Sequence, residues 1–289
     1  MNDCRGTIIS PMNENIHKYK KLYLYTKIKG ILFMLFNEII FGPIKSRRLG
    51  TSLGINVLPI ETKYCTFDCV YCECGWTHAN QEKKAKLFTR TQIKEAMEKR
   101  FPELLEQNII PESITLAGNG EPTIHPEFLG ITEDTIKLRD TYFPNAKLTV
   151  LSNASLIKRP HVKEALYKFD NRILKLDAGS EEMFNRINRP VKKSIFKEIL
   201  NELISFDGNL IIQTLFFKGE YAGEIIDNTS TEEVELWLGH LKKINPRYVM
   251  LYGLDRETPT KTLIKLSKSE IDSIAKQVRT IGIKADVYT

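Results

Sequence analysis

The feature that most limits the fold of this 289-residue sequence is a regular alternation of short apolar runs with longer helix-like segments. The apolar runs are rich in Ile, Val, Leu and Thr and are bounded by Gly, Asn or Pro, which is typical of β-strands. Because each helical crossover returns the chain to the same end of a sheet, the alternation predicts parallel strands. The predicted strands are Ser52–Leu58, Ser113–Ala117, Lys147–Leu151, Ile173–Asp177, Asn209–Phe217 and Tyr248–Leu254.

Helical segments fall between and after these strands. The first is preceded by a capping box, in which Thr89 and Gln92 satisfy each other's free backbone donors. Six strands alternating with six helices suit either a doubly wound open sheet or a barrel, and the order alone leaves both open. The predicted helices are Thr91–Glu106, Glu127–Asp140, Pro160–Lys168, Ser194–Phe206, Glu232–Lys243 and Lys268–Gly282.

The first forty residues differ from the rest of the chain. They are rich in Lys and Tyr and lack the caps and the apolar periodicity found downstream. We therefore predict two parts: residues 1–40, an N-terminal extension that is disordered or precedes the true start, and residues 41–289, a single domain without an internal linker. Met34 is a natural initiator, so we expect residues 1–33 to lie outside the functional domain.

The overall charge of the chain argues against a dedicated nucleic-acid surface. The formal net charge is +6, and residues 1–40 supply half of it, with six Lys or Arg against three Asp or Glu. The remainder is small for an electrostatic footprint on nucleic acid, so such a partner is not supported by charge. The longest early apolar run, Ile31–Phe36, falls far short of the ~18 residues of a membrane span. We predict a cytoplasmic protein without a membrane partner.

Four of the five cysteines, at positions 65, 69, 72 and 74, fall within ten residues. Disulfide frameworks spread their cysteines through small secreted domains, so this grouping indicates a metal site in a reducing compartment. Cys65, Cys69 and Cys72 form a C-x3-C-x2-C pattern directly after the first predicted strand. Three thiolates can ligate three irons of a 4Fe-4S cluster, with the fourth iron open to a small ligand.

Two other assignments of the cysteine group remain open at this point. A structural zinc site would use all four cysteines, although zinc ligands usually come as spaced C-x2-C pairs. An electron-carrying iron–sulfur protein would normally have more cysteines and a shorter chain.

The cysteine pattern, with the aromatic Tyr71 before the last cysteine, resembles the signature of the radical S-adenosylmethionine (SAM) superfamily. This resemblance implies a partial TIM-type (β/α)6 barrel, one 4Fe-4S cluster and SAM as cofactors. It also implies a SAM-derived radical that takes a hydrogen atom from a substrate. Further motifs resemble the branch that contains the tRNA wyosine-base synthetases and bacterial relatives of unassigned substrate: Phe41–Gly50, Gly118–Pro126, Asp177–Ser180 and Asn188–Pro190.

The resemblance also suggests which residues contact SAM. Gly118, Asn119, Gly120 and Glu121 resemble the family's Gly-Gly-Glu element with Asn119 inserted, and Glu121 would accept hydrogen bonds from the SAM ammonium. The glycines would let the backbone approach the methionine moiety closely. Ser152, Asn153 and Asp177 lie at strand ends, where sites of parallel barrels are built, and by the resemblance they would contact the SAM carboxylate and ribose. Tyr71, directly before Cys72, resembles the aromatic residue that packs near the adenine. Gln213 lies in the middle of an apolar strand, where a polar side chain is either satisfied within the barrel or faces a ligand.

Arg47 and Arg48 precede the first predicted strand, so we expect them at the opposite end of the barrel in structural ion pairs. The resemblance implies an electron donor such as a flavodoxin or ferredoxin. The functional alternatives are modification of a tRNA base, activation of a glycyl-radical enzyme and simple electron transfer. The sequence lacks the several upstream cysteines of the archaeal wyosine enzymes, with only Cys4 there, which disfavours a tRNA substrate.

Overall fold

The computed structural model describes residues 23–28, 31–77, 85–256 and 258–288. Its main element is an eight-stranded sheet in the order β12-β11-β8-β7-β6-β5-β4-β3. All neighbouring strands are parallel except the β3–β4 pair, which is antiparallel. The sheet consists of β3 (Ile40–Ser46), β4 (Gly50–Ile55), β5 (Ser113–Leu116), β6 (Lys147–Ser152), β7 (Asn171–Lys175), β8 (Ile211–Leu215), β11 (Tyr248–Tyr252) and β12 (Ala285–Tyr288).

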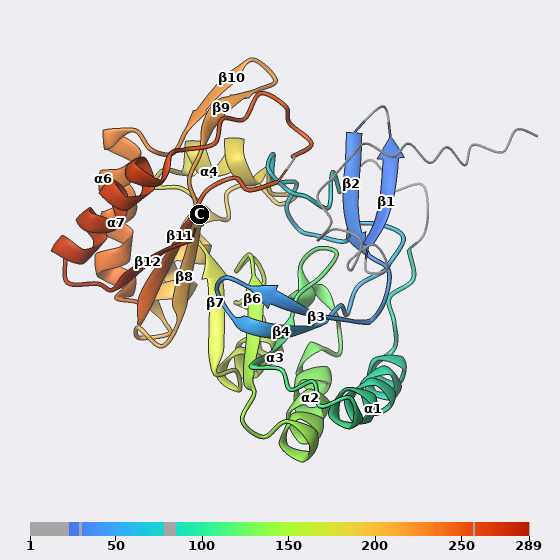
Figure 1. Ribbon diagram of the computed structural model, residues 1–289. Helices are drawn as coiled ribbons and strands as arrows, with labels where there is room; N and C mark the ends of the chain where they lie inside the picture. The colour runs from blue at the N-terminus through green and yellow to red at the C-terminus, as the bar shows by residue number, and fades with distance from the viewer. Residues whose placement is uncertain (1–22, 29–30, 78–84, 257, 289) are drawn as a thin grey trace, which may run out of the picture.

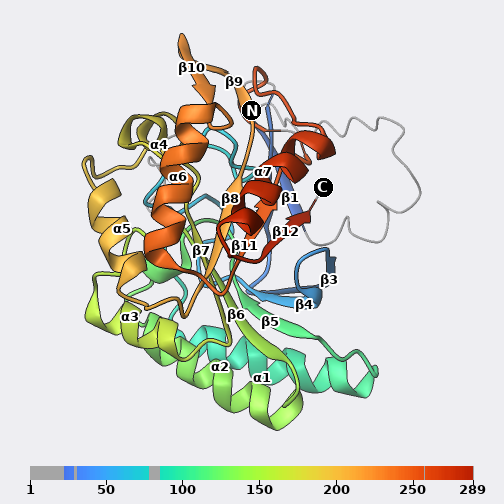
Figure 2. The same ribbon diagram turned by 90° about the vertical axis from the view of Figure 1, so that its left-hand side faces the viewer.

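The sheet curves into a partial barrel whose outer face is covered by the helices (Figures 1 and 2). This confirms the predicted partial TIM-type α/β architecture, and each predicted strand and helix overlaps an observed one. The helices are α1 (Arg90–Glu106), α2 (Phe128–Tyr142), α3 (Pro160–Tyr167), α4 (Glu181–Asn188), α5 (Phe196–Ile204), α6 (Thr231–Ile244) and α7 (Lys268–Thr280).

Several elements escaped the sequence-based prediction. Strand β3 contains Pro43 and a register shift between Phe41 and Ile44, features that hide an edge strand from pattern analysis. A small hairpin of β9 (Lys218–Tyr221) and β10 (Glu224–Asp227) turns at Ala222 and Gly223, both at positive φ. Helix α4 begins at Ser180, whose side chain accepts a hydrogen bond from the Met183 amide. Strands β9, β10 and β12 are four residues long, too short for a periodic signal.

The two faces of the sheet have different contents. Because successive strand residues point to opposite faces, Leu174 and Ile212 contribute to the large core beneath the helices, whereas Ile173 and Ile211 face the inside of the barrel. Leu49, in the turn between β3 and β4, packs against this inner cluster. The same alternation places residues two positions further along, at the carboxyl ends of the strands, on the inner face.

Residues 23–28 and 31–36 form a separate two-stranded antiparallel sheet, β1 (Tyr23–Ile28) and β2 (Ile31–Phe36), which the sequence analysis did not predict. The end of β2 contacts the main domain. The Phe36 ring stacks on Phe41 with ring centroids 3.6 Å apart, and the Phe36 backbone exchanges two hydrogen bonds with the side chain of Asn119. The Met34 amide donates to the Glu73 carbonyl at 3.0 Å. The division at residue 40 stays a prediction.

A chain beginning at Met34 loses the pairing of β2 with β1 but retains the contacts of Met34 and Phe36 with the main domain, so we expect it to fold and to take up iron as the full chain does. A chain beginning at Phe41 loses both bonds to Asn119, and we expect lower thermal stability or lower iron content. Thermal unfolding and iron analysis of the three proteins measure this. Loss of iron in the Met34 chain would show that residues 1–33 are part of the working domain.

No helix in the described ranges combines the length and the apolar character that crossing a membrane requires.

Candidate functional site

The cysteine loop, residues 63–75, follows β4 at the mouth of the barrel. Cys65, Cys69, Cys72 and Cys74 are all free thiols; Cys69 is buried and the other three are half-buried. Within the loop, the Cys72 amide donates to the Cys69 carbonyl at 3.1 Å, and the Gly75 amide donates to the Cys72 carbonyl at 2.9 Å. These two hydrogen bonds form consecutive tight turns, which keep Cys69, Cys72 and Cys74 on one short segment of the loop.

The Gly118–Glu121 segment after β5 is clamped against the start of the cysteine loop. The Tyr64 amide donates to the Asn119 carbonyl at 2.7 Å, and the Glu121 amide donates to the Tyr64 carbonyl at 3.1 Å. A Cβ at Gly120, where φ is +142°, would lie 1.9 Å from the Tyr64 carbonyl oxygen. Gly120 is therefore required for this close backbone contact within the protein.

The side chain of Asn119 joins the Gly118–Glu121 segment to β2 and to the segment after β4. Its side-chain amide nitrogen donates to the carbonyls of Phe36 and Pro59, and its side-chain oxygen accepts from the Phe36 amide. The residue is fully buried. Its described hydrogen bonds therefore position the loop, and its assignment as a SAM contact stays a prediction.

Glu121 is a buried carboxylate at the centre of three strand ends. Its Oε1 accepts hydrogen bonds from the Thr123 amide, the Thr123 hydroxyl and the Ser152 hydroxyl, while its Oε2 accepts from the Asn153 amide at 2.6 Å. Burial raises the pKa of Glu121, and these donors oppose the rise. Oε2 has one described donor, so it retains capacity for a further hydrogen bond.

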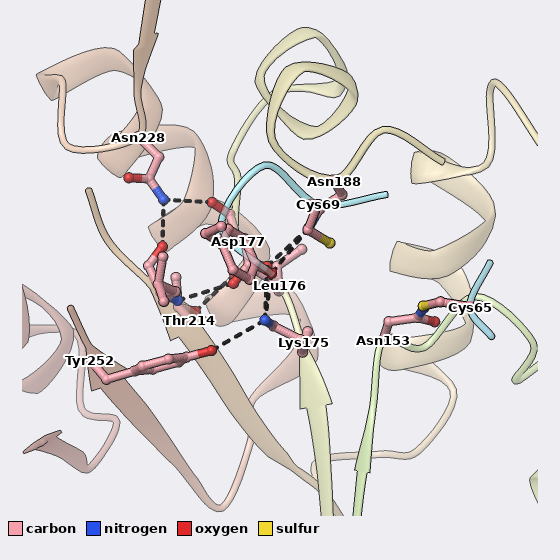
Figure 3. A network of polar contacts seen from close by, with 12 residues as sticks. Cys65, Cys69, Asn153, Lys175, Leu176, Asp177, Asn188, Thr214, Asn228 and Tyr252 are labelled. Atoms are coloured by element: carbon pink, nitrogen blue, oxygen red, sulfur yellow. Dashed lines mark hydrogen bonds and ion pairs between the residues drawn. The ribbon is translucent and has the colours of Figure 1, made fainter. Parts of the chain in front are cut away.

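Asn153 joins this carboxylate to the cysteine loop. Its side-chain nitrogen donates to the Thr66 hydroxyl at 2.9 Å and lies 3.6 Å from the sulfur of Cys65. Figure 3 shows Asn153 beside Cys65. Ser152 and Asn153 thus both bond to Glu121, and Asn153 also contacts the first cysteine, while their role as SAM contacts stays a prediction.

A second polar network surrounds Asp177 at the end of β7 (Figure 3). Asp177 Oδ2 accepts from the Tyr71 hydroxyl at 2.6 Å and from Asn188 Nδ2 at 3.0 Å, and it lies 3.4 Å from Lys175 Nζ. The same Asn188 nitrogen lies 3.4 Å from the Cys69 sulfur. Tyr71 and Asp177, both proposed from the sequence, are therefore in direct contact.

Lys175 and Asn188 are site residues that the sequence analysis missed as ligand contacts. Lys175 Nζ donates to the hydroxyls of Tyr71 and Tyr252, so a cation lies within the aromatic wall of the cavity. Burial opposes its charge, but Asp177 and Tyr252 outweigh burial and hold the pKa of Lys175 above its ordinary value. Lys175 lies two residues before Asp177, so the alternation of side chains along a strand places both on the inner face of the sheet. This spacing is the feature of the sequence that could have identified Lys175.

Gln213 lies beside Lys175 in the register of β7 and β8. It is 3% exposed, and its Nε2 finds no hydrogen-bond partner among the described residues. Buried polar atoms are normally satisfied, so an orphaned donor of this kind marks a place where a ligand can complete the bonding.

A cavity of about 310 Å³ opens beside Tyr71 and Cys72. Arg47 and Arg48 line it, so the expectation that they lie at the opposite end of the barrel is wrong. The physical reason is the β3–β4 turn, which folds toward the barrel interior and is held there by Leu49. The expected ion pair of Arg47 exists, with Asp255 at 2.8 Å.

Arg48 and three tyrosines give this cavity its aromatic and cationic character. The Arg48 guanidinium lies 5.0 Å from the centre of the Tyr252 ring, within the range of a cation–π contact. Tyr71 and Tyr288 are the other tyrosines lining the cavity.

The free thiols of the cysteine loop are the type of ligand that an iron–sulfur cluster requires. Burial raises the pKa of Cys65 to about 12, and the Lys63 charge opposes this shift. Burial also raises the pKa of Cys69, and the charges of Lys175 and, after it, Lys63 oppose that shift. A hydrogen bond with Cys74 lowers the pKa of Cys72 well below its ordinary value, and Lys63 acts in the same direction. Thiolates are the ligands that iron–sulfur clusters require, so a buried cation beside them favours the ligating form.

The surroundings also fit SAM, which carries an ammonium, a carboxylate and a ribose. Glu121 offers a carboxylate oxygen with remaining capacity, and Gln213 offers an orphaned amide donor. Both are buried: Glu121 follows the end of β5, and Gln213 lies in the middle of β8 beside Lys175.

Comparison with known proteins agrees with this geometry. The model of the family described as "Radical SAM superfamily" matches residues 60–229. A UPF0026 protein of Helicobacter pylori (strain J99) is 35% identical over 241 residues, which cover 81% of this chain and 71% of that protein.

Two solved structures show the same fold. A radical SAM methyltransferase from Sphaerobacter thermophilus superposes with a TM-score of 0.61 at 14% identity, covering 96% of this chain and 82% of that one. An archaeal TYW1 superposes with a TM-score of 0.52 at 15% identity, covering 93% and 90%. With the family match and the UPF0026 relative, these observations establish that the chain belongs to the radical SAM superfamily and, within it, to the UPF0026 proteins.

Proposed function

We propose that this protein reductively cleaves SAM at a 4Fe-4S cluster held by Cys65, Cys69 and Cys72. When bound, these two cofactors supply a 5′-deoxyadenosyl radical, which removes a hydrogen atom from a substrate not yet identified. The observation that carries the proposal is the pair of backbone hydrogen bonds between the cysteine loop and the Gly118–Glu121 segment. A loop of free thiols is hydrogen-bonded to the segment that presents the buried Glu121 carboxylate.

The chain's own residues would hold SAM in a defined orientation. Glu121 Oε2, which has one described donor, would accept a charge-assisted hydrogen bond from the SAM ammonium. Gln213 Nε2 is a donor for an oxygen of the ligand. Ser152 and Asn153 hold the Glu121 carboxylate in place, and Asn153 also supports Cys65.

The Asp177 network would define the opposite wall. Asp177 accepts from Tyr71 and Asn188, which fixes the aromatic ring directly before Cys72. We assign Tyr71 to the adenine side and Asp177 to the ribose side of SAM. The cavity beside Tyr71 and Cys72 then gives the substrate access to the radical.

Radical SAM chemistry needs a reductant. We propose a flavodoxin or ferredoxin as the electron donor and the cytoplasm as the compartment. The four free thiols of the cysteine loop fit a reducing environment of this kind.

Anaerobic reconstitution tests the proposal. The purified chain should bind close to four irons and, after reduction with dithionite, convert SAM to 5′-deoxyadenosine and methionine, both measured by liquid chromatography. Uncoupled cleavage without substrate is the expected activity. A protein that binds the cluster but produces no 5′-deoxyadenosine would instead be an electron carrier.

A further inference from the structure

The cavity beside Tyr71 and Cys72 has more positive than negative side chains in its wall. Three arginines and two carboxylates line it, so these groups leave one positive charge in excess. They are Arg47, Arg48, Arg256, Glu73 and Asp255. A cavity of this composition attracts a ligand that carries negative charge.

Two of the three arginines already have a carboxylate partner. An Arg47 nitrogen lies 2.8 Å from Asp255, and an Arg256 nitrogen lies 2.9 Å from Glu73. Asp255 is also 3.8 Å from the ammonium of Lys265, so it serves two cations at once. Both carboxylates of the cavity are therefore engaged by cations other than the third arginine.

Arg48 is this third arginine. Its side chain is half-buried, and within the ranges that the structure describes its guanidinium has neither a hydrogen bond nor an ion pair. Its contact is with the ring of Tyr252, whose centre lies 5.0 Å away. A guanidinium held on an aromatic ring keeps the N–H groups at its edge available to an anion.

The β3–β4 turn holds Arg48 at the cavity. The amides of Arg48 and Leu49 both donate to the Ser46 hydroxyl, each at 3.2 Å. The Leu49 side chain packs against the inner cluster of the barrel. Gly50 follows at a φ of +66°, and a Cβ there would collide with the Glu112 carboxylate. The turn is thus fixed on both sides of the arginine, which places the cation before any ligand arrives.

We propose that Arg48 binds a carboxylate or phosphate group of the substrate, which makes the substrate a small organic acid or a phosphate ester. An arginine presents a planar fork of donors that matches either oxyanion with two parallel hydrogen bonds. The same cavity is lined by Cys72, so a substrate anchored on Arg48 lies beside the cysteine loop. The inference rests on the proposed function, because it takes this cavity as the route to the radical.

Ligand-observed nuclear magnetic resonance on the reconstituted full-length protein, unreduced and saturated with SAM, tests the proposal. The probes are benzoate, phenyl phosphate and the neutral analogue benzamide, whose rings suit a cavity lined by tyrosines. The wild type should bind at least one of the two anions about tenfold or more tightly than benzamide, because the neutral amide lacks a charge-assisted bond. The anion that binds more tightly identifies the group as carboxylate or phosphate.

Arg48→Met should lower the affinity for that anion about tenfold or more, to the level of benzamide. Arg48→Lys keeps the charge without the planar fork, so its affinity should fall between those of Arg48→Met and the wild type. Lys45→Met is the matched control. It removes an exposed cation from β3 of the same hairpin, away from the cavity wall, and should bind the anion as the wild type does. An equal loss in Lys45→Met and Arg48→Met would assign the effect to overall charge and overturn the proposal.

The other outcomes are also decisive. Equal binding of benzamide and both anions by the wild type overturns the proposal. Anion binding that disappears when SAM is added also overturns it, because Arg48 would then serve the SAM carboxylate. If Arg48→Met unfolds at a lower temperature than the wild type, Arg48→Gln takes its place and must show the same loss of anion affinity.

A parallel assay separates this inference from the proposed function. The same wild-type preparation is reduced and analysed for 5′-deoxyadenosine. Failure to take up the cluster or to cleave SAM overturns the proposed function and this inference with it. SAM cleavage by a protein that shows no preference for the anions overturns this inference alone.

Discussion

Replacing Cys65, Cys69 or Cys72 with Ala is expected to abolish cluster binding and SAM cleavage. With one thiolate removed, two remain, and two ligands cannot retain a cluster that needs three from the protein. Iron and sulfide content should fall to background in each variant, and 5′-deoxyadenosine should become undetectable. The change is local, because these thiols are free and lie on a loop outside the strands.

Cys74→Ala is the control for the ligand assignment. Cys74 is close to Cys72 but is reserved from iron binding in this proposal, because the fourth iron must stay open for SAM. Iron content should therefore match the wild type. If Cys74→Ala alone lost its iron, Cys74 would be a ligand and the assignment would need revision.

Glu121→Gln is expected to weaken SAM binding by about 10- to 100-fold while the iron content is retained. The replaced bond to an ammonium is charge-assisted, and such bonds contribute roughly 1.5–3 kcal/mol. The structure adds a second cost. A Gln amide NH2 must face a donor on one side, either at Thr123 or at Asn153, because both oxygens of Glu121 now accept backbone amides.

Thr123→Val separates these two effects. It removes the 2.6 Å hydroxyl bond to Oε1 but leaves the carboxylate charge, so SAM affinity should change less than tenfold. Titration of SAM followed by the cluster absorbance measures both variants. Unchanged affinity in Glu121→Gln would exclude a bond to the SAM ammonium.

We expect the affinity for SAM to fall at low pH because of Glu121. Burial raises the pKa of Glu121, and only the ionised form attracts an ammonium strongly. Affinity should accordingly decline as the pH falls through that raised pKa, and Glu121→Gln should remove this decline.

The sequence predicted the parts of the molecule that follow local rules. The spacing of the cysteines identified the thiol loop, because one loop must supply all three thiolates. The strand–helix alternation predicted parallel pairing, because crossover connections impose it, whereas the partial barrel was implied by the resemblance to the radical SAM superfamily. Glu121, Ser152, Asn153 and Asp177 were found at strand ends for the same reason: parallel strands bring their carboxyl ends to one edge.

What the sequence by itself determined, then, was the grouping of the four cysteines and the order of the strands and helices, which depend on neighbours along the chain. Only the tertiary structure decided which distant residues meet. Lys63 is an ordinary basic residue in the sequence, and only the folded loop shows it buried beside the Gly75 carbonyl and Asp68. Arg48 was expected far from the site, and only the fold of the β3–β4 turn shows that it lines the cavity. Both placements depend on desolvation and on contacts between segments far apart in sequence, and local residue patterns do not encode either quantity.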